Sequence, residues 1–384
     1  MSSVSADSNN MPSIIPPNIR WGIIGLGDVT EKKSGPPFFK CEGAQLVAVM
    51  RRTPGKAAEW AKRVVPPENN CVGYDNLHDF LNHEGLDAVY IATPPGAQAT
   101  VCAEVAKAGK AVYVEKPVGR CAAETQAMMH AMEAAQKPFY TAYISRAYER
   151  TQAIRKLLQS KAIGDRVESI QYKVVGTGGA RGLDTDDLPW RLNASQAGGG
   201  LIMDIGCHII DRIDFLCGPL TEVEGKAENR GSPNQLVEDY VELSARIGSS
   251  DWASLPSDGA SVSCTWDFSG TSDEEPQDEL VIRGTTGSIK CVGMSPCLPV
   301  SVYDEAENLV QQLEFATPEH TAQALVQAVT DDLRGVTKAD FLSYGDNAVR
   351  ASMVLDKILG SYYGGREKGY WERTESWPGR PSMT

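Results

Sequence analysis

The strongest constraint on the fold is a regular alternation of short apolar runs and helical segments over the first third of the chain. Such a strand–helix rhythm is typical of a parallel, doubly wound α/β sheet. Thr53 followed by Pro54 predicts the start of one helix, and residues 97–108 are the clearest other helix. We expect the strands of this sheet at residues 19–25, 45–51, 86–92 and 110–114.

The rhythm changes near Tyr140, where strand-like runs begin to follow one another. Neighbouring strands favour an antiparallel or mixed sheet, so we predict a second α/β domain with an open, mostly antiparallel sheet. A helix is expected at 151–160, and helices at 322–333 and 348–362 close the chain. The expected strands of the second sheet are 167–175, 220–227, 239–247, 261–268 and 279–284, with polar surface loops at 249–259 and 270–277.

Composition narrows the class of protein. The chain has 384 residues, and its formal net charge of -13 argues against nucleic acid or an anionic membrane as the main partner. No apolar run reaches the roughly 18 residues that a membrane span requires. The nine cysteines form no C-x-x-C pair and never cluster with histidine at ligand spacing. We therefore expect free thiols in a reducing, cytoplasmic setting, no membrane association and no metal site.

A glycine loop directly follows the first expected strand. Gly25 and Gly27 allow a sharp turn and a close approach of the backbone to a pyrophosphate. The charge of that group would meet the helix amides that begin at Asp28 and Val29. Thr30 stands where this fingerprint usually has a third small residue. A tight turn without a ligand is the alternative, which the position of the loop in the first strand–helix unit makes weaker.

The second expected strand ends at Arg51 and Arg52, where NAD-selective sites usually place an acid for the ribose 2′-hydroxyl. A guanidinium matches the oxygens of a 2′-phosphate instead. The sequence therefore favours NADP as the cofactor. NAD remains the alternative if both arginines only face solvent.

Lys116 follows the apolar run at 110–114 within a Val-Glu-Lys-Pro sequence. Ligands of open α/β sheets bind beyond the carboxyl ends of the strands, so this lysine is expected at the active edge. Partial desolvation beside a nicotinamide is expected to lower its pKa into a range useful for acid–base chemistry. Taken alone, Lys116 would more simply be a surface lysine before a turn proline.

A second cluster lies at 198–211, where three glycines precede a helical stretch. Asp204 and His208 are four residues apart and share one face of that helix. A carboxylate beside an imidazole suits proton transfer, because histidine titrates near neutral pH. The alternative is a helix-terminal acid with a structural histidine.

Together these motifs resemble the glucose–fructose oxidoreductase, inositol dehydrogenase and MocA (Gfo/Idh/MocA) family over residues 20–365. Gln98 departs from the pattern, because relatives often carry histidine there. The matching segments are the glycine loop, Ala92-Thr93-Pro94-Pro95, Val114-Glu115-Lys116-Pro117, Ala162-Ile163-Gly164, Pro189-Trp190-Arg191, and Gly198-Gly199-Gly200 with Asp204, Gly206, His208 and Asp211.

The resemblance implies an N-terminal Rossmann domain and assigns roles to the site residues. His208 would be the main proton donor or acceptor on the substrate oxygen. Lys116 would polarise that oxygen or share the proton, and Asp204 would hold the substrate or orient its neighbours. Trp190 and Arg191 would either contact the substrate or support the residues that do. The expected cofactor contacts are Gly25, Gly27, Asp28, Val29, Arg51, Arg52, Thr93, Pro94, Glu115 and Lys116.

The implied activity is hydride transfer between NAD(P) and a carbonyl or hydroxyl of a small sugar, anhydro-sugar or polyol. A dehydrogenase of the trans-dihydrodiol type is the nearest alternative. A non-catalytic NADP(H) sensor and a transferase that recycles bound NADP are two others. The lysine, aspartate and histidine together argue against the sensor.

The domain boundaries follow from the same patterns. We expect a disordered tail over 1–18, the Rossmann domain over 19–142, a substrate and oligomerisation domain over 143–365 whose last helix packs back on the first domain, and a tail over 366–384. The alternation in 167–175 and 261–268 predicts an apolar outer face of the second sheet. A homodimer or homotetramer is therefore expected, with a monomer as the alternative.

Overall fold

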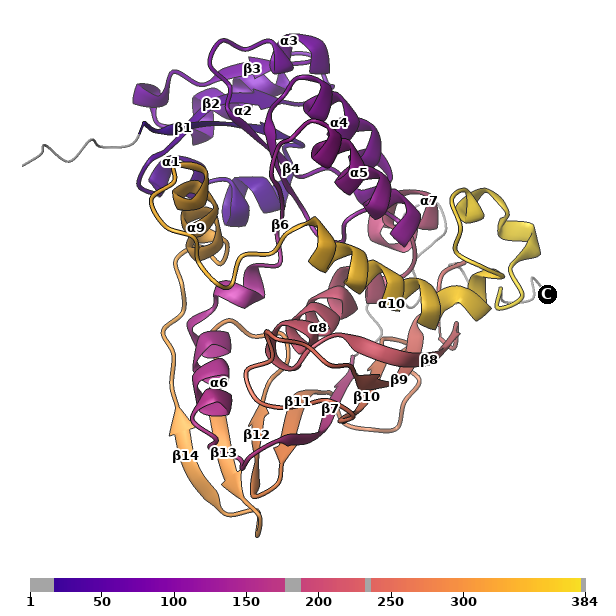
Figure 1. Cartoon of the computed structure of the whole chain (residues 1–384). Coiled ribbons are helices and arrows are strands. Elements are labelled where there is room, and N and C mark those ends of the chain that lie inside the picture. Colours follow the sequence, from indigo (N-terminus) through magenta and orange to yellow (C-terminus); the bar gives the residue numbers. More distant parts are fainter. Residues whose placement is uncertain (1–16, 177–187, 232–235, 381–384) are drawn as a thin grey trace, which may run out of the picture.

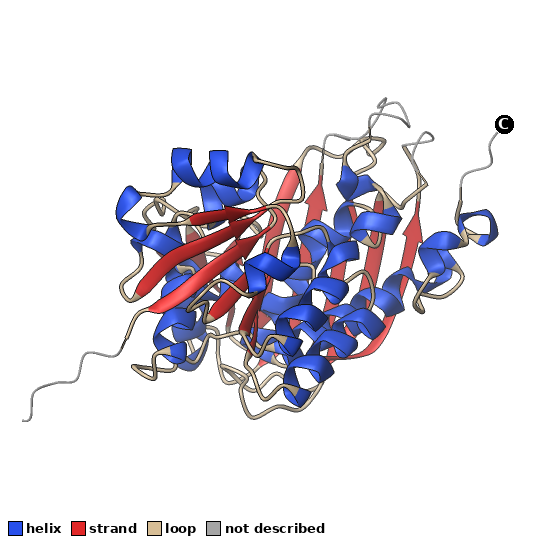
Figure 2. Cartoon of the chain, turned by 90° about the horizontal axis from the view of Figure 1, so that it is seen from above, coloured by secondary structure: helices blue, strands red, loops and turns tan. Residues whose placement is uncertain are grey.

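A computed structural model of the chain describes residues 17–176, 188–231 and 236–380. Two sheets organise it, and Figure 1 places the first sheet and its helices above the second, with α8 and α10 between them. Figure 2, seen from above, shows the strands of both sheets with helices packed against them. Except for residues 17 and 18, the expected N-terminal tail lies outside the described residues.

The first sheet has six parallel strands in the order β3-β2-β1-β4-β5-β6. This is the strand order of a dinucleotide-binding Rossmann sheet, and it confirms the predicted doubly wound fold. Every residue of β4 and β5 is buried, as expected for parallel strands covered on both faces. The strands are β1 Ile19–Ile24, β2 Ala44–Met50, β3 Val72–Tyr74, β4 Ala88–Ile91, β5 Ala111–Val114 and β6 Phe139–Thr141.

The helices around this sheet follow the strands in turn. The N-cap expected at Thr53 is wrong, because α2 begins only at Lys56, after Gly55 turns the chain with a φ of 75°. A short π-helix at Thr30–Ser34 separates the glycine loop from α1. The α-helices are α1 Pro37–Lys40, α2 Lys56–Val64, α3 Leu77–Leu81, α4 Pro95–Lys107 and α5 Ala122–Ala134.

The second sheet has eight strands in the order β14-β13-β12-β11-β7-β10-β9-β8. All neighbours are antiparallel except β7 and β10, which confirms the predicted mostly antiparallel sheet. The strands are β7 Val167–Val175, β8 Leu220–Glu228, β9 Tyr240–Ile247, β10 Ser261–Asp267, β11 Gln277–Gly284, β12 Gly287–Cys291, β13 Val300–Asp304 and β14 Leu309–Leu313.

The outer face of β7 and β10 is polar, so the expected apolar face on the two strands is wrong. Most apolar side chains of β7 and β10, such as Ile170 and Trp266, are buried in the core. That core lies under α8, where Gly206 approaches the Trp266 ring. The positions of the two strands left exposed or half-buried include Glu168, Gln171, Lys173, Ser261, Ser263 and Thr265.

The two long C-terminal helices return to the first sheet. α9 packs its apolar face into the same core as Trp21 of β1, whose indole N–H donates to Thr330 at 3.3 Å. α10 contacts α5, where the hydroxyls of Thr125 and Ser352 are 3.0 Å apart. The remaining helices are α6 Glu149–Gln159, α7 Ala194–Ala197, α8 Leu201–Cys217, α9 Gln323–Leu333 and α10 Gly345–Tyr363, with 3-10 turns at Pro67–Asn69, Ile144–Ala147, Trp190–Leu192, Tyr370–Glu372 and Thr374–Ser376.

The segment expected as a C-terminal tail is folded as far as the structure describes it, to Arg380. Tyr370, Trp371 and Trp377 are buried there, and the Trp377 ring stands edge-on to Tyr363 of α10. Aromatic rings of this size contribute much of the apolar area that a segment buries. The segment is therefore part of the core rather than an appendage.

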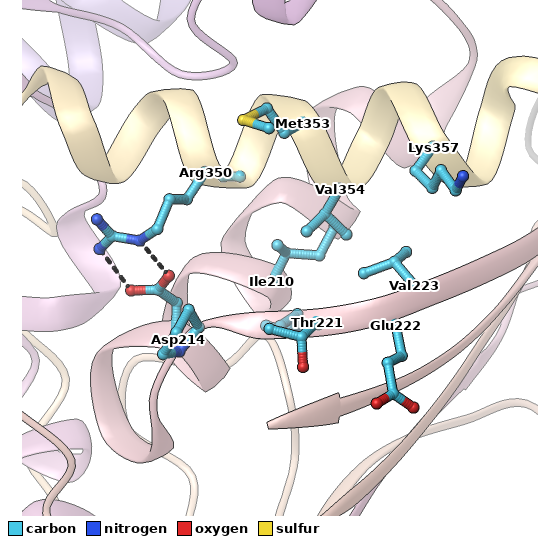
Figure 3. A pocket seen from close by; sticks show the side chains of 12 residues that line it. Ile210, Asp214, Thr221, Glu222, Val223, Arg350, Met353, Val354 and Lys357 are labelled. Carbon is cyan, nitrogen blue, oxygen red and sulfur yellow. Dashed lines mark hydrogen bonds and ion pairs between the residues drawn. The ribbon is translucent and has the colours of Figure 1, made fainter. Parts of the chain in front are cut away.

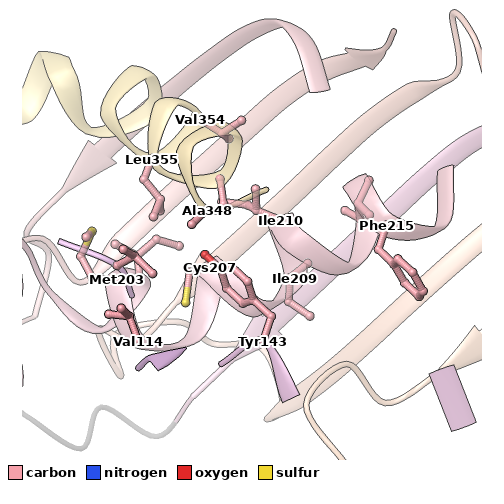
Figure 4. Packing of buried hydrophobic residues seen from close by; sticks show 14 of the residues in the cluster. Val114, Tyr143, Met203, Cys207, Ile209, Ile210, Phe215, Ala348, Val354 and Leu355 are labelled. Carbon is pink, nitrogen blue, oxygen red and sulfur yellow. The ribbon is translucent and has the colours of Figure 1, made fainter. Parts of the chain in front are cut away.

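Helix α8 lies at the centre of the hydrophobic core that contains Ile170 and Trp266 of the second sheet. Figure 4 shows Ile210 of α8 facing Ala348 and Val354 of α10, with Tyr143 packed on the other side. No helix in the described part of the chain has the length and apolarity needed to cross a membrane.

Candidate active site

The glycine loop after β1 has the conformation that a dinucleotide site needs. Gly25 has a φ of +99°, and a Cβ there would lie 2.8 Å from the carbonyl of Ala92, so only glycine fits. A Cβ on Gly27 would meet no atom within 4 Å, which leaves open space beside the backbone. The hydroxyl of Thr30 accepts from the Gly27 amide and donates to its carbonyl, both at 2.8 Å. Thr30 therefore braces the loop in place of the usual small residue.

A cleft of about 640 Å³ opens above this loop. The hydroxyl of Thr93 is buried in the wall and has no hydrogen-bond partner among the described residues, so it is available to a ligand. The open space beside Gly27 and the unpaired hydroxyl of Thr93 are both consistent with a bound dinucleotide. The lining residues are Ile24, Gly25, Leu26, Gly27, Asp28, Val29, Thr30, Met50, Arg51, Arg52, Ala92, Thr93, Pro94, Ala97, Thr100, Val101, Trp190 and Arg191.

Eight of the ten expected cofactor residues line this cleft, and the other two, Glu115 and Lys116, do not. The Glu115 carboxylate instead accepts hydrogen bonds from the Tyr90 hydroxyl at 2.9 Å and the Lys116 amide at 2.8 Å. Burial raises the pKa of the Glu115 carboxyl above its ordinary value. Its observed contacts hold the turn that carries Lys116.

The end of β2 presents two exposed arginines to the cleft. Nη1 of Arg51 donates to the Leu26 carbonyl at 3.3 Å, which draws the guanidinium toward the glycine loop. No acidic residue takes the corresponding position at the end of this strand.

Asp204 joins two distant segments. Lys116 Nζ lies 2.5 Å from Asp204 Oδ1 and 3.1 Å from the Asp204 carbonyl oxygen, although the two residues are 88 positions apart. Arg191 Nε donates to the other carboxylate oxygen at 3.0 Å. Asp204 therefore orients one cation from the first domain and another from the loop before α8.

These contacts set the charges in the site. Burial would favour the neutral form of both partners, but their mutual attraction outweighs burial. The pKa of Asp204 is lowered to about 2 and that of Lys116 is raised above its ordinary value. The lowered lysine pKa expected from the sequence is wrong, because the expectation considered desolvation without the carboxylate. Lys116 is thus a fixed ammonium at neutral pH.

His208 lies one turn after Asp204 on α8 and is 6% exposed. Burial, and then the charge of Lys116, hold the pKa of its imidazole well below the ordinary value. Its Nδ1 has no hydrogen-bond partner among the described residues, and Tyr143 stands edge-on to the ring at 6.2 Å between centroids. The structure therefore brings a neutral imidazole and a charged lysine to one carboxylate.

The position of α8 depends on residues that sequence reasoning did not select. A Cβ on Gly200 would lie 2.1 Å from the Glu238 carbonyl oxygen, and the Gly200 amide donates to the Glu238 carboxylate at 2.9 Å. At the next turns, Asp211 receives a bidentate pair of bonds from the buried Arg146, at 2.9 and 2.7 Å. In the sequence, the glycine run and Asp211 belonged to the matching motif, whereas Glu238 and Arg146 carried no signal.

Gln98 has a structural place in the site. Its side chain is fully buried, donates to the Glu115 carbonyl at 2.8 Å and accepts from the Gly119 amide at 2.7 Å. It therefore bridges the two ends of the turn that carries Lys116.

Trp190 and Arg191 lie at the edge of the cofactor cleft. The Arg191 guanidinium covers the Trp190 ring at 4.4 Å while its Nε holds Asp204. These two residues thus connect the cleft to the Lys116–Asp204 pair.

A different cavity, of about 300 Å³, opens between α8, β8 and α10 (Figure 3). Asp214 and Arg350 line it and are paired through two hydrogen bonds, at 2.7 and 2.8 Å. None of the expected site residues lines this cavity. In the part of the chain that the structure describes, no group of three or more histidine, cysteine or acidic side chains could hold a metal ion.

Comparison with known proteins identifies the family of the chain. Residues 19–143 match the family described as "Oxidoreductase family, NAD-binding Rossmann fold", and residues 151–290 match the "GFO/IDH/MocA C-terminal domain". Among curated proteins, Oxidoreductase P35 of Formosa agariphila is 30% identical over 90% of this chain and 98% of its own length.

Two further relatives extend the comparison. The dTDP-3,4-didehydro-2,6-dideoxy-alpha-D-glucose 3-reductase of Saccharopolyspora spinosa is 28% identical over 60% of this chain and 64% of its own length. A solved complex of levoglucosan dehydrogenase with NADH shares the fold, with a TM-score of 0.72, 20% identity, and coverage of 89% of this chain and 96% of that one. The chain therefore belongs to the Gfo/Idh/MocA family of oxidoreductases, with an NAD-binding Rossmann domain.

Proposed function

We propose that this chain is an NADP(H)-dependent oxidoreductase that acts on a carbonyl or hydroxyl group of a small sugar, anhydro-sugar or polyol. The observation that carries the proposal is the meeting of Lys116 and His208 around Asp204, which Arg191 connects to the dinucleotide cleft. Two relatives, a deoxysugar reductase and levoglucosan dehydrogenase, support a sugar-like substrate.

The preference for NADP(H) rests on the end of β2. Arg51 and Arg52 line the cleft beside the glycine loop, where an acid would repel a 2′-phosphate and a guanidinium attracts it. The levoglucosan dehydrogenase complex contains NADH, so relatives of this fold also accept the other cofactor. The charge at this one strand end is what favours NADP(H) here.

The bound nicotinamide would supply or accept the hydride. In oxidation, the neutral imidazole of His208 accepts the proton of the substrate hydroxyl at Nε2, the ring nitrogen opposite the buried Nδ1. Lys116 Nζ stays charged and stabilises the negative charge that develops on the oxygen. In reduction, the same proton returns from His208 to the substrate. Asp204 keeps Lys116 in place and fixes its charge.

The test is turnover by the wild-type protein and by His208→Ala on a panel of sugars, anhydro-sugars, polyols and their keto forms, with NADP+ or NADPH. Removing a general acid–base typically costs about 100- to 10,000-fold in rate. We expect a loss of that size in kcat with unchanged NADPH affinity. His78→Ala is the control, because that side chain is 85% exposed, and it should behave as wild type.

Two outcomes would contradict the proposal. Wild-type turnover in His208→Ala would remove the proton role of the imidazole. Tight NADPH binding without turnover on any panel member, in either direction, would instead favour a sensor.

The assembly of the protein stays a prediction. A homodimer or homotetramer through the second sheet would have to use its polar outer face, with Lys173 and Thr265 among the half-exposed groups. Such an interface would rest on hydrogen bonds and ion pairs more than on apolar burial. Light scattering on the purified protein measures the state directly.

A further inference from the structure

Two arginines are buried together beyond His208. Arg212 lies one turn after His208 on α8 and is 1% exposed. Arg150, on α6, is fully buried. Both guanidinium groups turn toward the loop after β12, at residues 292–295.

Their hydrogen bonds are incomplete. Nη1 of Arg150 donates to the carbonyls of Val292, at 2.8 Å, and of Ser295, and Nη1 of Arg212 donates to the carbonyl of Gly293. Nε and Nη2 of Arg150 and Nε of Arg212 are buried and have no partner among the described residues. Backbone carbonyls thus satisfy one nitrogen of each arginine and leave three nitrogens free.

The cluster also lacks a paired counter-ion. Within the described ranges, neither guanidinium has a carboxylate within ion-pair distance. Asp278 lies in the same region, but its two oxygens accept from the amides of Gly293 and Met294, each at 3.0 Å. Burial lowers the pKa of Arg150, and the charge of Arg212 lowers it further. Guanidinium groups stay charged in proteins, so two arginines beside the single Asp278 carboxylate leave this region with a net positive charge.

The free nitrogens of Arg150 form a specific edge. Nε and Nη2 lie on the same side of the planar group, and this edge binds the two oxygens of a carboxylate through parallel hydrogen bonds. Nε of Arg212 adds another donor. Three uncommitted donors suit a planar monoanion with two oxygens better than a phosphate, which presents more oxygens and more charge.

The cluster is close to the reacting groups. One helix turn separates Arg212 from His208, a rise of about 6 Å along α8. The positive charges of Arg212 and Lys116 both counteract the burial that raises the pKa of the Tyr148 hydroxyl. Tyr148 lines a cavity of about 410 Å³ together with Pro296, the residue after the Ser295 carbonyl that Arg150 holds.

We propose that Arg212 and Arg150 form a carboxylate subsite, and that the substrate is a sugar acid, with its carboxylate a few carbon atoms from the carbon that reacts at His208. The proposal rests on the proposed function and names the substrate class of that site. Hydride and proton transfer are unchanged, since the carboxylate only binds and orients the molecule. A neutral sugar would leave the three donors unpaired.

The experiment compares matched acid and neutral ligands on the NADP-loaded protein, by calorimetric binding and by turnover. The probes are D-gluconate with D-glucitol, D-glucuronate with D-glucose, and glucose 6-phosphate. A charge-assisted hydrogen bond typically changes affinity by about 10- to 100-fold. We expect at least one acid to bind that much more tightly than its neutral partner, and the difference to shrink in Arg212→Met.

Arg212→Lys keeps the charge but loses the planar fork, so its acid preference should fall between those of wild type and Arg212→Met. Arg166→Met is the matched control, because Arg166 is an exposed arginine whose Nη2 donates to the Asp258 carbonyl. It should keep the full preference. Thermal unfolding of each variant shows whether a lost preference comes from lost structure.

Equal binding of every acid and its neutral partner by the wild-type protein would overturn the subsite, whether or not the variants fold. Tighter binding of glucose 6-phosphate than of either acid would replace the carboxylate with a phosphate. Turnover of neutral sugars with no acid preference would leave the proposed function standing and remove only the subsite. Acid-selective binding without any turnover would support the subsite and contradict the proposed function.

Discussion

At Asp204 the local chemistry depends on which side chains have a charged partner and which do not. The carboxylate is shared between Lys116 and Arg191, so no oxygen of it is left without a cation. His208, one turn away, has no such partner and stays neutral because of its burial. The site thus separates a permanent charge, on Lys116, from a group able to exchange a proton, on His208. This division of roles follows from environment rather than from residue type.

The cofactor preference is a prediction at the same scale. We expect the wild-type protein to have a kcat/KM for NADPH at least 10-fold above that for NADH, because Arg51 offers a charge-assisted contact to the 2′-phosphate. Arg51→Asp should reverse the order, since an acid repels that phosphate. Lys62→Asp, an equal charge change at an exposed position of α2, should not. Equal efficiency with the two cofactors in the wild type would remove the assignment.

Among the elements, the turn between β1 and the π-helix shows two different uses of glycine. Gly25 is required by the fold, because its positive φ and its contact with Ala92 exclude a side chain. Gly27 is not required by the fold, because nothing lies near its missing Cβ. Its use becomes clear only when the space beside it is reserved for a ligand.

Alanine substitution separates these two uses. Gly25→Ala should lower the free energy of unfolding by about 1–3 kcal/mol, because alanine is strained at a φ of +99°. Gly27→Ala should leave that free energy nearly unchanged and weaken NADPH binding at least 10-fold. Gly360→Ala, also in open space but on α10, is the control and should change neither quantity adversely. Normal NADPH affinity in Gly27→Ala would place the pyrophosphate elsewhere.

Across the whole molecule, the C-terminal segment ties the two halves of the site together. The buried guanidinium of Arg366 donates to the carbonyls of Gly198, at 2.6 Å, and Arg120, at 2.7 Å, and pairs with Asp356 of α10 at 2.9 Å. Gly198 begins the turn into α8, and Arg120 follows the Lys116 turn. The ring of Trp371 supports Arg120 from the other side, at 3.3 Å from its guanidinium carbon.

Substitution of Arg366 should lower the free energy of unfolding. Arg366→Met removes the only cation paired with Asp356 among the described residues and one donor from each of the two carbonyls, which keep the Tyr370 hydroxyl. The loss of one member of a buried pair typically costs about 3–5 kcal/mol. We expect a decrease of that size in the free energy of unfolding by urea, together with a lower kcat. Arg373→Met, which breaks an exposed pair with Glu367 in the same segment, should cost less than about 1 kcal/mol. A similar decrease in both variants would show that the buried contacts are not the cause.

The sequence by itself determined the two sheets, their order along the chain, the glycine loop and the Asp204–His208 face of α8. These features depend on neighbours within one or two turns, and the spacing of apolar and glycine residues expresses such short-range preferences directly. The polar outer face of β7 and β10 was missed because alternation predicts that two faces differ, not which one the core covers.

Only the tertiary structure decided which charges meet. The pKa of Lys116 is raised rather than lowered because Asp204, 88 positions away, pairs with it. The same holds for Arg150 beside Arg212, for Gln98 under the Lys116 turn and for Arg366 across both halves of the site. Interactions between buried charges change steeply with separations of a few ångströms, and in this chain those separations are fixed by how distant elements pack.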